Sequence, residues 1–202
     1  MSLPAVEYPK GISYEEFLAT VDESTHAEWV DGEVVLMTPP SDEHARISLF
    51  LAAVIEGWIE LSGAGGTVRH APYEMKLPIT ARQPDVLWAG PDKDARVTRR
   101  GLQGAADLVI EVVSPESRTR DRREKFIEYA QVGVREYWLV DPMRSTCEVY
   151  RLQKDGVYEL FQDGSGSRVE SSVLSGFWID PAWMWEAKPR IFTAFRAWKR
   201  VE

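Results

Sequence analysis

Two acidic residues of this sequence stand in or beside apolar segments, where a carboxylate can bind a metal or act as an acid. Glu111 is the one charge within Leu108–Val113, whose unbroken apolar character predicts a strand buried on both faces. An ionised carboxylate there is costly unless a cation or several hydrogen-bond donors meet it. Glu111 is therefore a metal ligand or a catalytic acid, or else the ion-pair partner of a nearby arginine.

Asp85 is the second acid, and it begins a short predicted strand, Asp85–Ala89, directly after Pro84. A Pro-Asp pair by itself is also common in turns. If this strand neighbours the strand of Glu111, however, two carboxylates meet at one edge of a sheet. Such a pair suits Mg²⁺, a hard cation that prefers oxygen ligands and can polarise a phosphoryl oxygen or lower the pKa of a bound water.

Lys125 is the third candidate, on a helix predicted from about Arg118 to Gln131, after the strand of Glu111. Asp121 stands four residues before Lys125, so the two share one helical face. The residues expected to face the core are Phe126, Ile127 and Ala130. An exposed Asp–Lys pair, which stabilises a helix little, is the ordinary alternative to a role in a site.

The elements expected around these residues form a mixed α/β fold. Helices are predicted after the capping residues Ser13 and Ser41, at about 118–131 and at about 190–199. Strands are predicted at 27–30, 33–37, 67–77, 85–89, 108–113, 136–140, 147–152 and 157–161. From Ser41 to Asp141 the order is α-β-β-β-α-β, which favours a mixed sheet covered by helices. We expect one domain, 1–202, with its core at about 41–141, an N-terminal hairpin, and a C-terminal β-hairpin followed by a helix.

Composition narrows the class of protein. The 202 residues are 44% hydrophobic and 28% charged, as in a globular domain. No apolar run approaches the about 20 residues that span a bilayer, and Met1–Lys10 lacks the pattern of a signal peptide. The single cysteine, Cys147, excludes an internal disulfide and a cysteine-based zinc site. We therefore expect a cytoplasmic protein that does not bind membranes.

The motifs together resemble the Uma-type restriction endonuclease family. They are Pro84-Asp85, Asp107–Pro115, Arg120–Lys125 and Tyr129–Pro142, with Glu28–Glu33, Pro39, Pro40 and His44 nearer the N-terminus. The resemblance covers about residues 13–180. It implies a restriction endonuclease-like fold of the PD-(D/E)XK superfamily, with the α-β-β-β-α-β core described above, and an endonuclease that uses Mg²⁺ or Mn²⁺ to hydrolyse phosphodiester bonds, with DNA as the expected substrate.

The resemblance also implies roles for single residues. Asp85 and Glu111 would bind the metal, and Lys125 would stabilise charge on the phosphate. The superfamily lysine would stand two residues after Glu111, but this sequence has Val113 there, so Lys125 would have to reach the site from the following helix. Supporting roles fall to Glu28, His44 and Asp121; an exposed strand glutamate and a capping or packing histidine are the plainer alternatives for the first two.

Nucleic acid is the expected partner, although the net charge of −8 argues against a broad electrostatic contact with it. Basic residues gather in one stretch, where the candidates for phosphate contact are Arg118, Arg120, Arg122 and Arg123. A homodimer would present two such stretches. The aromatic tail 174–202 is expected to cover the core or form a dimer contact, with base stacking as the alternative.

Three alternatives to the endonuclease remain open at this point, one of which is a hydrolase that acts on another phosphoester. A catalytically inactive nucleic-acid-binding or regulatory module with the same fold is favoured by Val113 and by the acidic net charge. A purely structural dimer built through the aromatic tail is the third. The position of Lys125 relative to Asp85 and Glu111 distinguishes the nuclease from the inactive module.

Overall fold

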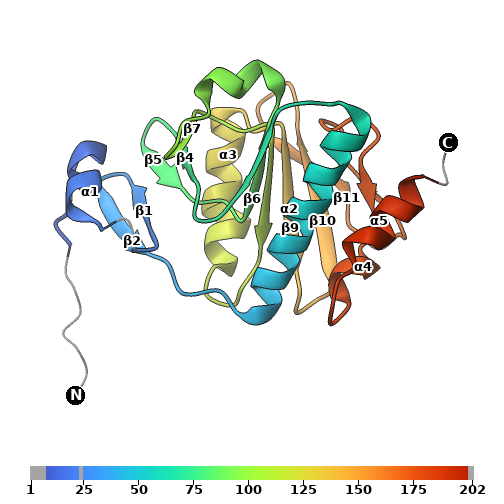
Figure 1. Ribbon diagram of the computed structural model, residues 1–202. Helices are drawn as coiled ribbons and strands as arrows, with labels where there is room; N and C mark the ends of the chain where they lie inside the picture. The colour runs from blue at the N-terminus through green and yellow to red at the C-terminus, as the bar shows by residue number, and fades with distance from the viewer. Residues whose placement is uncertain (1–7, 23–24, 200–202) are drawn as a thin grey trace.

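The computed structural model describes residues 8–22 and 25–199, and its centre is a six-stranded sheet (Figure 1). The strands lie in the order β11-β10-β9-β8-β6-β3. Their bounds are Thr67–His70 for β3, Val86–Ala89 for β6, Leu108–Val112 for β8, Glu136–Asp141 for β9, Thr146–Leu152 for β10 and Tyr158–Gln162 for β11. β8 and β9 are parallel and the other neighbours antiparallel. The sheet is therefore mixed, as the sequence predicts.

Helices cover both faces of this sheet. Helix α2, Asp42–Ser62, begins after its cap Ser41 and ends at Gly63, which adopts the left-handed conformation. It lies on one face together with α5, Ile191–Trp198, whereas α3, Phe126–Val132, lies on the other (Figure 1). The order α2-β3-β6-β8-α3-β9 within this layer is the predicted α-β-β-β-α-β core.

The alternation of side chains along β8 divides the interior into two cores. Leu108, Ile110 and Val112 pack in the core beneath α2, and Val109 packs in the core beneath α3. Because successive side chains of a strand point to opposite faces, Glu111 shares the face of Val109. The helix that follows β8 therefore covers the carboxylate of Glu111.

A second sheet contains five short strands in the order β2-β1-β5-β4-β7. Its strands β1 and β2 are the first two strands of the described chain. The bounds are Ala27–Val30 for β1, Glu33–Leu36 for β2, Glu74–Lys76 for β4, Thr80–Arg82 for β5 and Gly101–Gln103 for β7. The predicted hairpin of β1 and β2 turns at Asp31 and Gly32, both with positive φ. Helix α1, Tyr14–Thr20, begins with the predicted capping box and packs its Phe17 with Trp29 of β1.

The C-terminal segment covers the α2 side of the main sheet. It contains β12, Val169–Glu170, β13, Trp178–Ile179, α4, Ala182–Trp185, and α5. Phe177 and Trp198 are buried in the same core as α2, and both rings contact Trp58. The expectation that the aromatic tail covers the core is confirmed for these residues, while Phe192 stays 71% exposed.

The structure corrects the expected elements in several places. The single strand predicted at 67–77 is two strands, β3 and β4, which belong to different sheets. Strands β5 and β7 were not predicted, because three residues are too few to show a pattern. Residues Arg120–Lys125 form a π-helix that leads into α3. Ile127 was expected to face the core, but its side chain is 51% exposed because the inward face of α3 is formed by Phe126, Tyr129 and Ala130.

Within the described ranges, no helix combines the length and the apolar character needed to cross a bilayer. Most of the N-terminal stretch Met1–Lys10, in which no signal peptide was expected, lies outside the described residues.

Candidate active site

The buried carboxylate of Glu111 meets the ammonium group of Lys125. Lys125 Nζ lies 2.9 Å from Glu111 Oε1, and the hydroxyl of Tyr129 donates to the same oxygen at 2.9 Å. Both donors come from the helical segment after β8, one from the last residue of the π-helix and one from α3. The lysine thus reaches Glu111 from the helix, while Val113 packs in the apolar core beneath α3.

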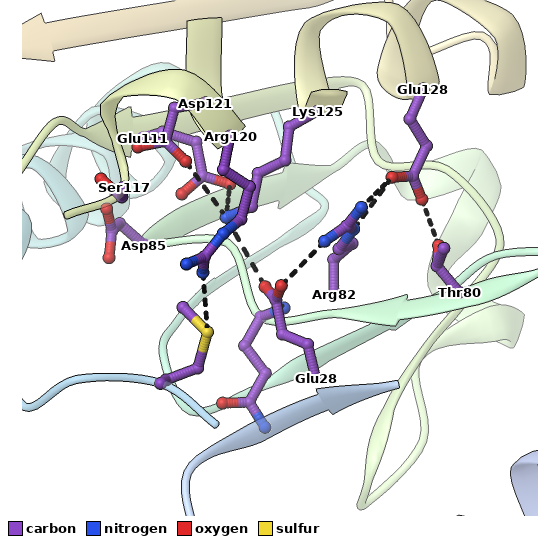
Figure 2. Close-up of polar contacts among 12 residues, drawn as sticks. Glu28, Thr80, Arg82, Asp85, Glu111, Ser117, Arg120, Asp121, Lys125 and Glu128 are labelled. Atoms are coloured by element: carbon purple, nitrogen blue, oxygen red, sulfur yellow. Dashed lines mark hydrogen bonds and ion pairs between the residues drawn. The ribbon is translucent and has the colours of Figure 1, made fainter. Parts of the chain in front are cut away.

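Lys125 lies among three carboxylates, as Figure 2 shows. Besides Glu111, its Nζ is 3.5 Å from Asp121 Oδ1 and 3.5 Å from Glu28 Oε1. An ammonium group has three N–H donors, so three acceptors match its capacity. Both side chains of the Asp121–Lys125 pair are buried, which rules out the alternative of an exposed surface pair.

Asp85 stands at the entrance to β6, beside the end of β8. Its Oδ2 accepts a hydrogen bond of 2.7 Å from the backbone N–H of Val112 and lies 3.1 Å from His44 Nε2. His44 is in the first turn of α2, where its backbone N–H donates to the Ser41 cap at 3.2 Å. The carboxylate of Asp85 is therefore fixed between the main sheet and the start of α2.

One cavity of about 790 Å³ brings these side chains together, and its volume lies within the range of ligand sites. Asp85, Glu111, Asp121, Lys125 and His44 all line it. Apolar residues also line it, among them Met37, Pro39, Pro40, Leu49, Pro115 and Met143. The three candidate catalytic residues from the sequence thus share one cavity that opens toward solvent.

Carboxylates outnumber cations in this cluster, and the pKa values show the consequence. Burial raises the pKa of Glu111 to about 8, and the charges of Asp121 and Asp85 add to the rise while Lys125 opposes it. Burial likewise raises the pKa of Asp121. Although burial opposes it, the surrounding carboxylates raise the pKa of Lys125, which keeps its charge. Within this cluster, the ammonium group of Lys125 is therefore surrounded by more than one carboxylate.

The chemistry of the two proposed ligands fits a hard divalent cation. Among the described residues, hydrogen bonds reach Oδ2 of Asp85 and Oε1 of Glu111, so one oxygen of each carboxylate carries no protein donor. In residues 8–22 and 25–199, no three His, Cys, Asp or Glu side chains gather as a metal-binding group. Mg²⁺ is commonly bound through one or two carboxylates, with water and substrate phosphates as further ligands.

Several expected residues lie around the site in other ways. Glu28 is fully buried behind the cavity wall, which decides against an exposed strand glutamate. Arg120 lines the cavity and donates to Met37 Sδ at 3.1 Å, and Arg123 is exposed. Arg118 Nη2 is 3.8 Å from Asp141 Oδ2.

Arg122 is bound within the protein. Its guanidinium donates to both carboxylate oxygens of Glu148, at 2.8 and 3.0 Å, and to Asp141 at 3.4 Å. A bidentate pair of this kind holds the planar guanidinium in place. Arg122 thus joins the π-helix to the main sheet, and it is less free than its neighbours to contact a phosphate.

Two residues at the site were missed by sequence reasoning. Tyr129 begins the motif Tyr129–Pro142, but nothing in its spacing indicates that its hydroxyl donates to Glu111. Arg82, at the end of β5, donates to Glu28 at 3.0 Å and was hidden because a three-residue strand gives no pattern. Its place three residues before Asp85 is the signal that could have drawn attention to it.

Comparisons with known proteins place this geometry in context. The chain is 27% identical over 184 residues to "Uncharacterized protein slr1290" of Synechocystis sp., which covers 88% of this chain and 93% of that protein. The fold of the present chain matches a crystal structure from Anabaena variabilis, titled "a putative nuclease belonging to DUF820", with a TM-score of 0.71. The two sequences are 19% identical, and the match covers 86% of this chain and 97% of the Anabaena chain. This similarity shows a restriction endonuclease-like nuclease fold.

A family model covers most of the sequence, including every candidate site residue. It is described as "Uma2: Putative restriction endonuclease" and matches residues 14–182. The Glu111–Lys125 contact and the convergence with Asp85 lie within this match. The chain therefore belongs to the Uma2 family of restriction endonuclease-like proteins.

Proposed function

We propose that this protein is a metal-dependent endonuclease that hydrolyses phosphodiester bonds in DNA. The observation that carries the proposal is the 2.9 Å contact between Lys125 Nζ and Glu111 Oε1 in the cavity that Asp85 also lines. Two carboxylates and an ammonium group at one place are the groups that phosphodiester hydrolysis needs. Membership of the Uma2 family supports this reaction class.

The side chains take distinct roles in this proposal. Asp85 and Glu111 hold Mg²⁺ or Mn²⁺, which when bound supplies Lewis acidity and an activated water. Lys125 stabilises the negative charge that grows on the phosphoryl oxygens. His44 keeps Asp85 oriented through their 3.1 Å contact, and Asp121 orients the ammonium group of Lys125.

DNA contact is assigned to the arginines beside the cavity. Arg120 lines the cavity, and Arg118 and Arg123 precede or follow it on the same segment. We propose that these three contact backbone phosphates, while Arg122 holds the segment to the sheet through Glu148. We also propose that two copies of the chain act together, because the net charge of −8 gives a single copy little attraction for DNA.

A non-catalytic nucleic-acid-binding module is the second candidate. The observation that favours it is Val113, which stands in the core where the superfamily places its lysine. Against it, Lys125 is not separated from the carboxylates, since it lies within contact distance of Glu111. The two candidates differ in one result, the cleavage of a DNA backbone.

Nicking of supercoiled plasmid DNA tests the proposal. The wild type is compared with Asp85→Asn, Glu111→Gln and Lys125→Met, in Mg²⁺, in Mn²⁺ and in EDTA. Glu136→Gln is the matched control, because Glu136 is also a fully buried strand glutamate but lies outside the cavity. We expect nicking that needs the metal, is abolished in the two acid variants, falls by about 100-fold in Lys125→Met, and persists in Glu136→Gln.

The opposite results are equally clear. Nicking that resists EDTA or survives in both acid variants would mean a contaminant or another site. Absence of nicking in folded wild type, with DNA binding retained in a mobility-shift assay, would establish the non-catalytic module.

A further inference from the structure

Arg82 is a buried cation that lies outside the cavity, and one of the two carboxylates that bind it, Glu28, also lies beside Lys125 of the cavity. Its Nη1 donates to Glu28 Oε2 at 3.0 Å, and its Nε and Nη2 donate to Glu128 Oε2 at 2.9 and 2.6 Å. Glu128 also accepts a hydrogen bond from Thr80. Figure 2 shows these side chains in a row, from Thr80 through Glu128 and Arg82 to Glu28. The guanidinium is thereby held at both ends.

Glu28 continues the row to Lys125. Its Oε2 accepts the hydrogen bond from Arg82. Its Oε1 accepts a hydrogen bond of 3.0 Å from the backbone N–H of Gln83 and lies 3.5 Å from Lys125 Nζ. The side chain of Glu28 is fully buried, so it needs these cations to remain charged. Although burial opposes it, Lys125 and Arg82 hold the pKa of Glu28 below its ordinary value.

Neither Arg82 nor Glu28 lines the cavity, so neither can touch a substrate there. Lys125 does line it, and the lysine stem has several rotatable bonds, so its ammonium group needs fixed acceptors to hold one position. Asp121 is on the same helical segment as Lys125 and Glu111 is a proposed metal ligand. Glu28 is the acceptor that comes from a different sheet, and the planar guanidinium of Arg82 fixes its orientation.

We propose that Arg82 is a positioning residue, which acts through Glu28 to hold the ammonium group of Lys125 at the place where the scissile phosphate binds. The effect on cleavage rests on the proposed nuclease function. The effect on Lys125 does not, because it concerns the geometry of the protein alone. The five-stranded sheet, which supplies both Arg82 and Glu28, then serves to complete the site.

Two variants remove different parts of this arrangement. Arg82→Lys keeps a positive charge but loses the planar fork that binds two carboxylates. Glu28→Gln keeps the shape and an acceptor for Gln83, but loses the charge that attracts Lys125. Glu136→Gln again controls for the loss of a buried strand glutamate away from the cavity. Near-ultraviolet circular dichroism selects the variants that fold. Arg82→Gln, which removes the guanidinium from both Glu28 and Glu128, is added if it folds.

The first measurement is the ¹³Cε resonance of Lys125 in protein labelled at lysine, assigned by its absence from Lys125→Met. The chain has only seven lysines, so the spectrum is simple. We expect the Lys125 resonance to move in Arg82→Lys and in Glu28→Gln and to stay in place in Glu136→Gln. An unmoved resonance in folded Arg82→Lys would overturn the proposal.

The second measurement is the rate of plasmid nicking. We expect kcat to fall by about 10- to 100-fold in Arg82→Lys and in Glu28→Gln with KM unchanged, because a displaced catalytic group lowers the rate without weakening DNA binding. Unchanged kcat in both variants, beside an active wild type, would overturn the proposal. If the wild type does not nick DNA, the nuclease function fails, and the resonance of Lys125 alone decides whether Arg82 positions it.

Discussion

The carboxylate of Glu111 has two different kinds of donor on one oxygen. Lys125 brings a charge and Tyr129 brings a neutral hydroxyl, each at 2.9 Å from Oε1. Both donors reach Oε1, so Oε2 is the oxygen that would bind the proposed metal ion. Partners of this kind, which orient a metal ligand without touching the metal, commonly change metal affinity when they are removed.

Tyr129→Phe tests this arrangement. The variant removes only the hydroxyl and keeps the ring, which packs edge-on against the ring of Tyr137 with 5.4 Å between the ring centroids. We expect Mn²⁺ affinity to fall by about 10-fold, because Glu111 then rotates more freely, and stability to fall by about 1 kcal/mol. Titration followed by electron paramagnetic resonance measures the affinity. Tyr158→Phe is the control, since that hydroxyl donates to the Val134 carbonyl away from the cavity; an equal loss in both variants would contradict the idea.

At this scale the sequence reveals acids more readily than their partners. Glu111 could be found because a charge within an apolar strand has a physical cost that demands a partner. Asp85 could be found because it begins a predicted strand that can lie beside the strand of Glu111. Arg82 and Tyr129 could not be found in this way, because arginine is ordinary on a surface and tyrosine is ordinary in a core. Their roles depend on which elements lie side by side in the fold.

Among the elements, the π-helix Arg120–Lys125 decides which side chains enter the site. Both Asp121 and Lys125 are buried in it, and the Tyr137 hydroxyl donates to the backbone carbonyl of Asp121 at 3.0 Å. A π-helix is wider than an α-helix and is frequent at functional sites. The sequence predicts a helix here and its Asp–Lys pairing, but periodicity calculated for an α-helix cannot give the widened turn.

We expect the contact between α2 and α5 to affect the stability of the protein but not the geometry of the site. A side-chain carbon on Gly57 of α2 would clash with the ring of Phe195 of α5. Position 57 is thirteen residues from His44, or about 20 Å along the helix. Substitution here should therefore change stability while the geometry of the cavity persists.

Gly57→Ala should lower the free energy of unfolding by about 1–3 kcal/mol, the usual cost of overpacking, although alanine favours a helix. The loss should shrink in Gly57→Ala/Phe195→Leu, which makes room for the methyl group. Glu56→Ala, at the exposed neighbouring position, should be nearly neutral. Urea denaturation measures the three variants. A fall in stability that Phe195→Leu does not relieve would show that the clash is not the cause.

For the whole molecule, the two sheets differ in how well the sequence predicts them. The six-stranded sheet follows from long apolar strands and a well-capped helix α2, which the sequence shows plainly. The five-stranded sheet joins a predicted hairpin to strands of three residues that come from later in the chain. Its assembly depends on tertiary contacts such as the Arg82–Glu28 pair, which no local pattern predicts.

The acidic character of the whole chain limits how it can bind the proposed DNA substrate. With a net charge of −8, attraction to phosphates must come from the local arginines, and Arg122 is already bound to Glu148. In a plot of the logarithm of the DNA-binding constant against the logarithm of the salt concentration, each phosphate contact makes the slope more negative by about 0.9. Three arginines in one chain would give a slope of about −3, and a dimer that presents both sets would give about −5.

Fluorescence anisotropy with duplex DNA in EDTA, over a range of KCl concentrations, measures this slope, and sedimentation equilibrium gives the mass of the free protein. We expect a dimer and a slope of about −5. Arg120→Gln should reduce the magnitude of the slope by about 2, one contact per chain, whereas Arg122→Gln should leave it unchanged because that guanidinium is bound to Glu148. A monomer with a slope of about −3 would contradict the dimer and leave the contacts intact. An unchanged slope in Arg120→Gln would move the DNA contact to another face.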